Sequence, residues 1–185
     1  MSFDHIMTTL RVDLLSLQRE ATVIREQFGT GHQPKFYMLL YALLMAAFAQ
    51  VDLFSALREG KRPKGNKQVM IRFLADFTSR DQAAIAHAIQ LYRHTTMHTG
   101  RPRALVDPQS GQSRYYLLHW GRNGADEAAH FTVDDTGKLT MNLECLLEDV
   151  ICAFDAFASE VRESPHIAAN VIKAWPRVVQ QVWGA

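Results

Sequence analysis

Apolar side chains recur at the spacing of an α-helix through much of this chain. One repeat near the N-terminus runs through Leu10, Leu14, Leu17, Ala21, Ile24 and Phe28. A wider stripe follows Asn142 and comprises Leu143, Leu146, Leu147, Val150, Ile151, Phe154, Phe157 and Val161. Residues three and four apart share one face of a helix, so each segment is predicted to bury one side against a neighbour. Helices of this kind stabilise one another by packing, which predicts a helical bundle.

Helix breakers and capping residues bound these segments. The first helix is predicted over residues 3–28, before Gly29 and Gly31, and the second from Pro34 to Glu59, with Gly60 as a stop. A basic loop, residues 61–67, precedes a short helix over 68–77, and Ser79 is expected to cap a further helix over 80–99. The helix capped by Asn142 is expected to end before Pro165, and a last helical stretch to be interrupted at Pro176.

A β insertion is expected between the motif-bearing helix and the helix after Asn142, at about residues 113–141. The aromatic run from Tyr115 to Trp120 is typical of a strand. Residues 130–133 and 138–141 flank the turn sequence Asp-Asp-Thr-Gly, which indicates a β-hairpin. The predicted fold is therefore a single mainly α domain over residues 1–185: an antiparallel bundle of four to six helices with a small antiparallel hairpin or meander.

Composition limits the kind of partner. The chain has 185 residues, 20 Lys and Arg against 19 Asp and Glu, and a formal net charge of +1. A uniformly basic nucleic-acid surface is therefore not expected, and any RNA contact must be local. The apolar run over residues 36–49 is shorter than a membrane span, so it is interpreted as the central helix of a soluble bundle, with Asp52 at its surface.

A cytoplasmic location is expected from the cysteines and the N-terminus. Cys145 and Cys152 lie seven residues apart on one predicted helix, which is too far for a disulfide, so both are expected to be reduced core residues. The first residues lack the basic and apolar segments of a secretory signal.

The stretch from Arg93 to His98, Arg-His-Thr-Thr-Met-His, carries the strongest chemical signal. A guanidinium group stays charged and matches phosphate oxygens, whereas an imidazole exchanges protons near neutral pH. This pair suits phosphate chemistry.

The motif Arg93-His94-x-x-x-His98, late in a predicted helix that follows two long apolar helices, resembles the signature of the HEPN-domain family. The resemblance covers roughly residues 3–164. It implies a metal-independent endoribonuclease that acts as a homodimer in a defence or toxin-like role, with an antitoxin as a partner and no cofactor. It also implies that His98 transfers protons, that Arg93 stabilises charge on the phosphate, and that His94 orients RNA or Arg93.

Helical geometry makes this activity depend on a second copy. Arg93 and His98 would lie about 140° apart around one ideal helix, so a single chain does not readily aim both at one atom. Two facing copies could combine their groups. Arg101 and Arg103, together with Lys61, Arg62 and Lys64 of the basic loop, are the candidates for holding RNA phosphates.

Three other interpretations of these residues stay open. The chain could be a non-catalytic HEPN-like module that binds a nucleotide or a protein. His94 and His98, one helical turn apart, could instead bind the metal of a hydrolase, with Asp52, Asp76 or His87 as a third ligand. Finally, Arg93 could form a structural salt bridge, with His87, His94 and His98 as surface residues opposite a core face that contains Ile85 and Ile89.

Overall fold

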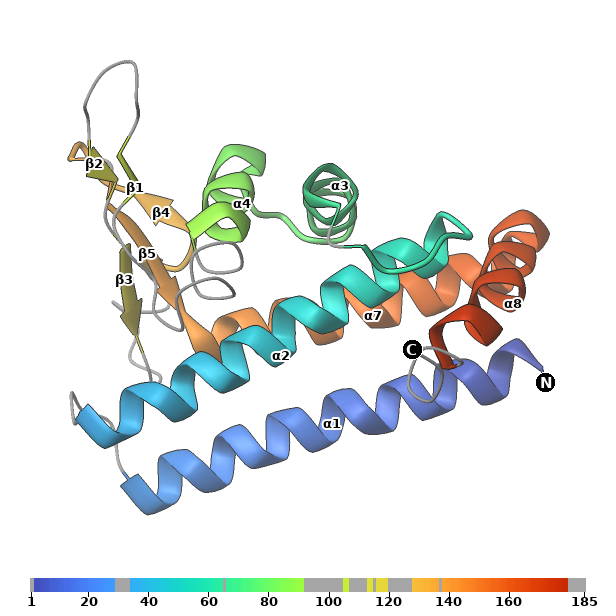
Figure 1. Cartoon of the computed structure of the whole chain (residues 1–185), viewed down its shortest axis with the longest axis horizontal. Helices are drawn as coiled ribbons and strands as arrows, with labels where there is room; N and C mark the ends of the chain where they lie inside the picture. The colour runs from blue at the N-terminus through green and yellow to red at the C-terminus, as the bar shows by residue number, and fades with distance from the viewer. Residues whose placement is uncertain are drawn as a thin grey trace.

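In the computed structural model the protein is a mainly helical bundle with a small β region at one end (Figure 1). The structure describes residues 2–28, 34–64, 66–91, 105–106, 113–114, 116–119, 128–136 and 138–179. The described helices are α1 (Phe3–Phe28), α2 (Pro34–Arg58), α3 (Lys67–Phe77), α4 (Gln82–Ala88), α7 (Leu143–Glu163) and α8 (Pro165–Val179). The described strands are β1 (Leu105–Val106), β2 (Ser113–Arg114), β3 (Tyr116–His119), β4 (Thr132–Val133) and β5 (Leu139–Asn142). The predicted fold class is confirmed.

Helix α2 is the centre of the bundle. It contacts α1, α3, α7 and α8, and its buried side chains include Leu44, Phe48, Val51, Phe54 and Leu57. By length and composition the segment Leu39–Arg58 could cross a membrane, yet half of that window is buried inside the protein. Burial by helices on several sides is what the central helix of a soluble bundle shows.

The directions of the three long helices can be followed in Figure 1, and the ion pairs between these helices agree with them. Arg11, early in α1, pairs with Asp155 late in α7, and Arg25, late in α1, pairs with Glu144 at the start of α7. Helices α1 and α7 are therefore antiparallel. Arg58, the last residue of α2, bonds Glu160 near the end of α7, so α2 and α7 run in the same direction. The long connection through α3, α4 and the strands permits this parallel pair.

Several helix ends follow from local chemistry. Asn142 Oδ1 accepts hydrogen bonds from the backbone N–H groups of Glu144 (3.0 Å) and Cys145 (3.1 Å), which confirms it as the cap of α7. Gly60 follows α2 with φ of 65°, a conformation that glycine adopts without strain. A Cβ atom there would lie 2.7 Å from Asn170 Oδ1.

Two predicted helix features are wrong. Helix α4 is capped by Asp81, whose Oδ1 accepts from the Ala84 N–H at 2.8 Å, rather than by Ser79. The chain continues as a π-helical turn over residues 89–91, and the rest of the predicted helix lies outside the described residues. Helix α8 also runs through Pro176 without interruption. Pro176 lies in the last turn, where one lost hydrogen bond is outweighed by the packing of Ala174 and Trp175 on the core.

The β region is a mixed sheet rather than a meander. Strands β4 and β5 form the predicted antiparallel hairpin, but β3 pairs with β5 in parallel, which gives the order β3-β5-β4. Burial explains the order, because every residue of β5 is buried and this strand takes the centre. A separate antiparallel pair, β1 and β2, extends the β region to Leu105, before the predicted boundary.

Cysteine burial differs between the two predicted core thiols. Both are free, and Cys145 is buried as expected, but Cys152 is exposed. Seven residues are close to two full turns, so the two thiols lie only about 20° apart around α7, and the difference in exposure comes from their positions along the helix rather than from its angle.

The two asparagine caps provide a test of how burial affects capping. We expect Asn142→Ala to lower the free energy of unfolding by about 1–2 kcal/mol or more, because it leaves buried N–H groups without their acceptor. Asn66, which caps α3 with an exposed side chain, is the matched control, and Asn66→Ala should cost less. Urea unfolding measures both, and equal losses would contradict the assigned role of burial.

Candidate functional site

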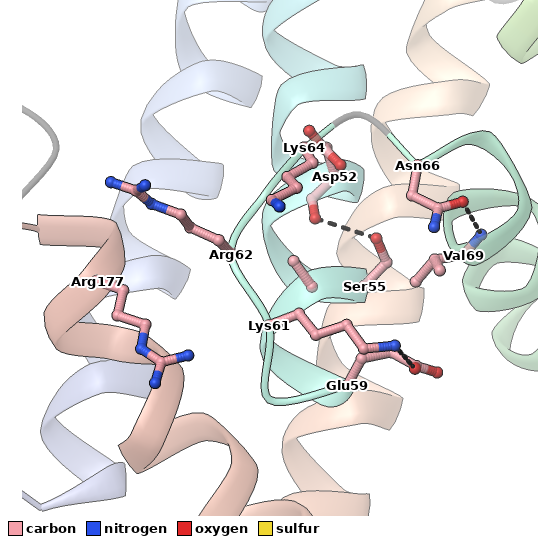
Figure 2. A pocket seen from close by; sticks show the side chains of 10 residues that line it. Asp52, Ser55, Glu59, Lys61, Arg62, Lys64, Asn66, Val69 and Arg177 are labelled. Atoms are coloured by element: carbon pink, nitrogen blue, oxygen red, sulfur yellow. Dashed lines mark hydrogen bonds and ion pairs between the residues drawn. The ribbon is translucent and has the colours of Figure 1, made fainter.

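A pocket lies where α2 ends and the basic loop begins (Figure 2). Its volume is about 310 Å³, near the lower end of the range for small-molecule sites. Ser55 and Ala56 are buried beneath it, and the remaining lining side chains are at least partly exposed. The lining comprises Asp52, Ser55, Ala56, Glu59, Lys61, Arg62, Lys64, Asn66, Val69 and Arg177.

Both ends of the basic loop are fixed by hydrogen bonds. At the start, the Lys61 N–H donates to the Ala56 carbonyl at 2.9 Å, and Asn170 Nδ2 donates to the Arg58 carbonyl at 2.9 Å. At the far end, Asn66 Oδ1 accepts from the Gln68 N–H at 3.1 Å (Figure 2 shows Asn66 bonded to Val69). The loop is thus held between α2 and α3, with its side chains around the pocket.

The pocket carries an excess of positive charge. Four cations, Lys61, Arg62, Lys64 and Arg177, line it with two carboxylates, Asp52 and Glu59. This local excess stands out in a chain whose formal net charge is only +1.

Lys61 and Glu59 largely offset each other. Lys61 Nζ donates to Glu59 Oε2 at 2.9 Å, and Arg72 also pairs with Glu59 at 3.3 Å. The hydrogen bond from Lys61 lowers the pKa of Glu59, so this carboxylate stays ionised at neutral pH. Over the whole lining, the four cations outnumber the two carboxylates by two, so the pocket favours an anion.

A hydrogen bond joins the start of α3 to the turn after α4. Lys67 Nζ donates to Gln90 Oε1 at 2.8 Å. The end of the basic loop is thus bonded to Gln90, which precedes Arg93 by three residues in the sequence.

Only part of the predicted site falls within the described residues. Lys61, Arg62 and Lys64 are brought together around the pocket, as their neighbouring positions in sequence suggested. Arg93, His94, His98, Arg101 and Arg103 lie outside the described residues.

Arg177 lines the pocket although nothing in the sequence indicates it. Arg177 belongs to α8, more than a hundred residues from the loop, and follows the Pro176 at which the helix was expected to break. No local pattern links it to the loop, because only the packing of α8 against α2 brings them together. Asp52 is partly buried and lines the same pocket.

The predicted outward direction of His87 is wrong. Its side chain is buried, with the residue only 7% exposed, because α4 is packed against α3 and β5. Of the other suggested metal ligands, Asp76 is hydrogen-bonded to Arg58. Within the described part of the chain, no three His, Cys, Asp or Glu side chains are grouped closely enough to hold a metal ion.

A second polar cluster lies under the β-hairpin at the start of α7. Arg80 Nε donates to Asp149 Oδ2 at 2.8 Å, and His130 Nε2 lies 3.1 Å from the same oxygen. A histidine beside a carboxylate can form an acid–base pair, but the Nδ1 of His130 accepts the Asn142 backbone N–H at 2.9 Å. Both ring nitrogens are therefore engaged inside the protein, and the cluster is structural.

The geometry fixes the protonation states in this cluster. Since Nδ1 is an acceptor, His130 is neutral and its Nε2–H donates to Asp149. Burial lowers the pKa of His130 and outweighs the opposing effect of Asp149. Burial alone would raise the pKa of Asp149, yet the hydrogen bonds from His130 and Arg80 lower it.

The neutral state of His130 predicts a loss of stability in mild acid. In the unfolded chain the His130 side chain takes up a proton near pH 6.5, whereas in the folded chain it stays neutral to lower pH. The stability from this group is therefore complete above pH 6.5. As the pH drops below 6.5, the free energy of unfolding decreases by up to about 1.4 kcal/mol per pH unit. His130→Phe should lower the free energy of unfolding at pH 7.5 and flatten its decline towards pH 5.5. His166→Gln, at an exposed position, is the control and should keep the decline. An unchanged decline in His130→Phe would refute this assignment.

Comparison of the chain with models of protein families, with curated proteins and with solved structures gives no significant match.

Proposed function

We propose that this protein is a metal-independent endoribonuclease of the HEPN type that acts as a cytoplasmic homodimer in a defence or toxin-like role, with an antitoxin as its partner. The observation that carries the proposal is the contact between Lys67 and Gln90. It joins the basic loop, which can hold RNA phosphates, to the segment that leads into the Arg93-to-His98 motif. The mainly helical fold supports the same assignment.

The chemistry requires few groups from the protein. The 2′-hydroxyl of RNA attacks the adjacent phosphorus, a new O–P bond forms, and the bond to the 5′-oxygen of the next nucleotide breaks. His98 transfers a proton from the 2′-hydroxyl to the departing 5′-oxygen, and Arg93 stabilises the negative charge that builds up on the phosphate oxygens. His94 orients Arg93 or the RNA. Arg62 and Lys64 hold a neighbouring stretch of RNA backbone, with Arg101 and Arg103 as further candidates.

Cleavage of a labelled single-stranded RNA in excess EDTA tests the proposal. We expect Arg93→Ala and His98→Ala each to lower the cleavage rate by about 100-fold or more, since each removes a group used in the transition state. Arg11→Ala is a matched control, because Arg11 lies on α1 and pairs with Asp155 at the surface. Equal rates in all four proteins would refute the mechanism, and RNA binding without any cleavage would favour the non-catalytic module.

Mixing the two inactive variants tests the need for a dimer. A mixed dimer carries one intact Arg93 and one intact His98 on different chains. If these groups act across the interface, an equal mixture of Arg93→Ala and His98→Ala should recover roughly a quarter of the wild-type rate. Light scattering gives the oligomeric state. A monomer at the assay concentration, or a mixture without activity, would contradict the shared site.

The basic loop should contribute to RNA affinity through charge. We expect the double variant Arg62→Gln, Lys64→Gln to weaken RNA binding. It should also reduce the slope of log affinity against log salt by about 0.7 for each RNA phosphate that the variant no longer neutralises. Arg162→Gln, Lys173→Gln also removes two exposed cations, from α7 and α8, and serves as the control. The same salt dependence in both double variants would exclude a specific role for the loop.

A further inference from the structure

We infer that the pocket at the end of α2 binds one ribonucleoside phosphate, with the phosphate held by Arg62, Lys64 and Arg177 and a ribose hydroxyl donating to Asp52. This ligand is either a free nucleotide or one nucleotide of an RNA strand. The inference goes beyond the proposed cleavage, because binding in this pocket does not require the motif residues.

The positive side chains come from two distant segments of the chain. Arg62 and Lys64 extend from the loop after α2, and Arg177 extends from α8 on the other side of the pocket (Figure 2). Like charges gathered around one hollow repel one another, and a bound anion relieves this repulsion. Two guanidinium groups and one ammonium group can each donate to phosphate oxygens, and arginine can do so through two parallel hydrogen bonds.

The carboxylate in the pocket selects among phosphate-containing ligands. Asp52 is partly buried on α2 and repels a bare phosphate ion. A ligand that also presents a hydroxyl donor turns the same carboxylate into a favourable partner, as acidic residues do with the ribose of dinucleotides. Within the lining, Asp52 therefore favours a sugar phosphate over an inorganic anion.

The rest of the lining fits a sugar and limits the ligand size. Ala56 and Val69 contribute apolar atoms that can pack against a ribose ring or a base. The hydroxyl of Ser55 donates to the Asp52 backbone carbonyl at 3.0 Å, which helps to fix the pocket floor. A volume of about 310 Å³ has room for a single nucleotide unit rather than for a stacked series of bases.

Calorimetric titration of the full chain with each ribonucleoside monophosphate tests the inference. We expect at least one to bind, and its 2′-deoxy analogue to bind more weakly. Arg177→Gln should weaken binding of the monophosphate by about tenfold or more, because a charge-assisted hydrogen bond is lost. Lys173→Gln, a lysine substitution on the same helix, is the control and should change the affinity little. Thermal unfolding shows whether each variant is folded.

Asp52→Asn gives a signature that a structural role would not produce. It should weaken binding of the ribonucleotide, removing most of its preference over the deoxy form, and strengthen binding of inorganic phosphate by removing a repelling charge. Absence of binding by all four monophosphates would overturn the inference. So would an Asp52→Asn protein that loses inorganic phosphate and ribonucleotide affinity equally.

Further experiments distinguish a free nucleotide from a nucleotide within RNA, and they test the binding pocket separately from RNA cleavage. Displacement of the monophosphate by a short RNA at lower concentration identifies an RNA nucleotide as the ligand, whereas the reverse order identifies a free nucleotide. A monophosphate contains no phosphodiester bond, so the titration is independent of cleavage. Failure to cleave RNA leaves this inference standing, and failure to bind monophosphates leaves the proposed nuclease standing.

Discussion

The burial of α2 is the constraint on which the rest of this structure depends. A helix apolar around most of its surface needs neighbours on several sides, and α1, α3, α7 and α8 provide them. The same packing decides what surrounds the end of α2. There α8 approaches the loop that leads to α3, and cations from both segments line one pocket. The candidate site is thus a consequence of how the core helix is enclosed.

Polar contacts in this protein divide into those that hold helices together and those that line the pocket. Arg58 shows the first kind: it forms two hydrogen bonds with Glu160 and lies 4.7 Å from the ring centre of Phe77. Its pKa is raised chiefly by its hydrogen bonds with Glu160, which favours the charged form at every physiological pH. The His130 cluster belongs to the same kind, because its donors and acceptors are satisfied within the fold. A ligand has little to gain from either group.

The basic loop shows how a chain of nearly neutral charge can attract an anion. Glu59 draws Lys61 and Arg72 into ion pairs, while Arg62 and Lys64 line the same pocket as Arg177. The pocket therefore has a local excess of positive charge, although the net charge of the whole chain is only +1. It also explains why net charge excluded an extended nucleic-acid surface but not a compact phosphate site.

Local patterns in the sequence were sufficient for the parts of the fold that depend on neighbouring residues. The bounds of α1, the stop at Gly60 and the cap at Asn142 each depend on contacts a few residues apart, so spacing and residue type determine them. The helix was wrongly expected to break at Pro176, because the sequence reveals the loss of a backbone hydrogen bond at proline but not the tertiary packing that outweighs this loss.

Tertiary structure alone decided which distant segments meet. The sequence by itself determined a helical bundle with a β-hairpin and grouped Lys61, Arg62 and Lys64 on one loop. It did not determine the parallel pairing of β3 with β5, the burial of His87 or the presence of Arg177 at the pocket. Those features arise because burial of apolar surface joins segments far apart in the chain, and no short-range pattern encodes which of the compatible faces will meet.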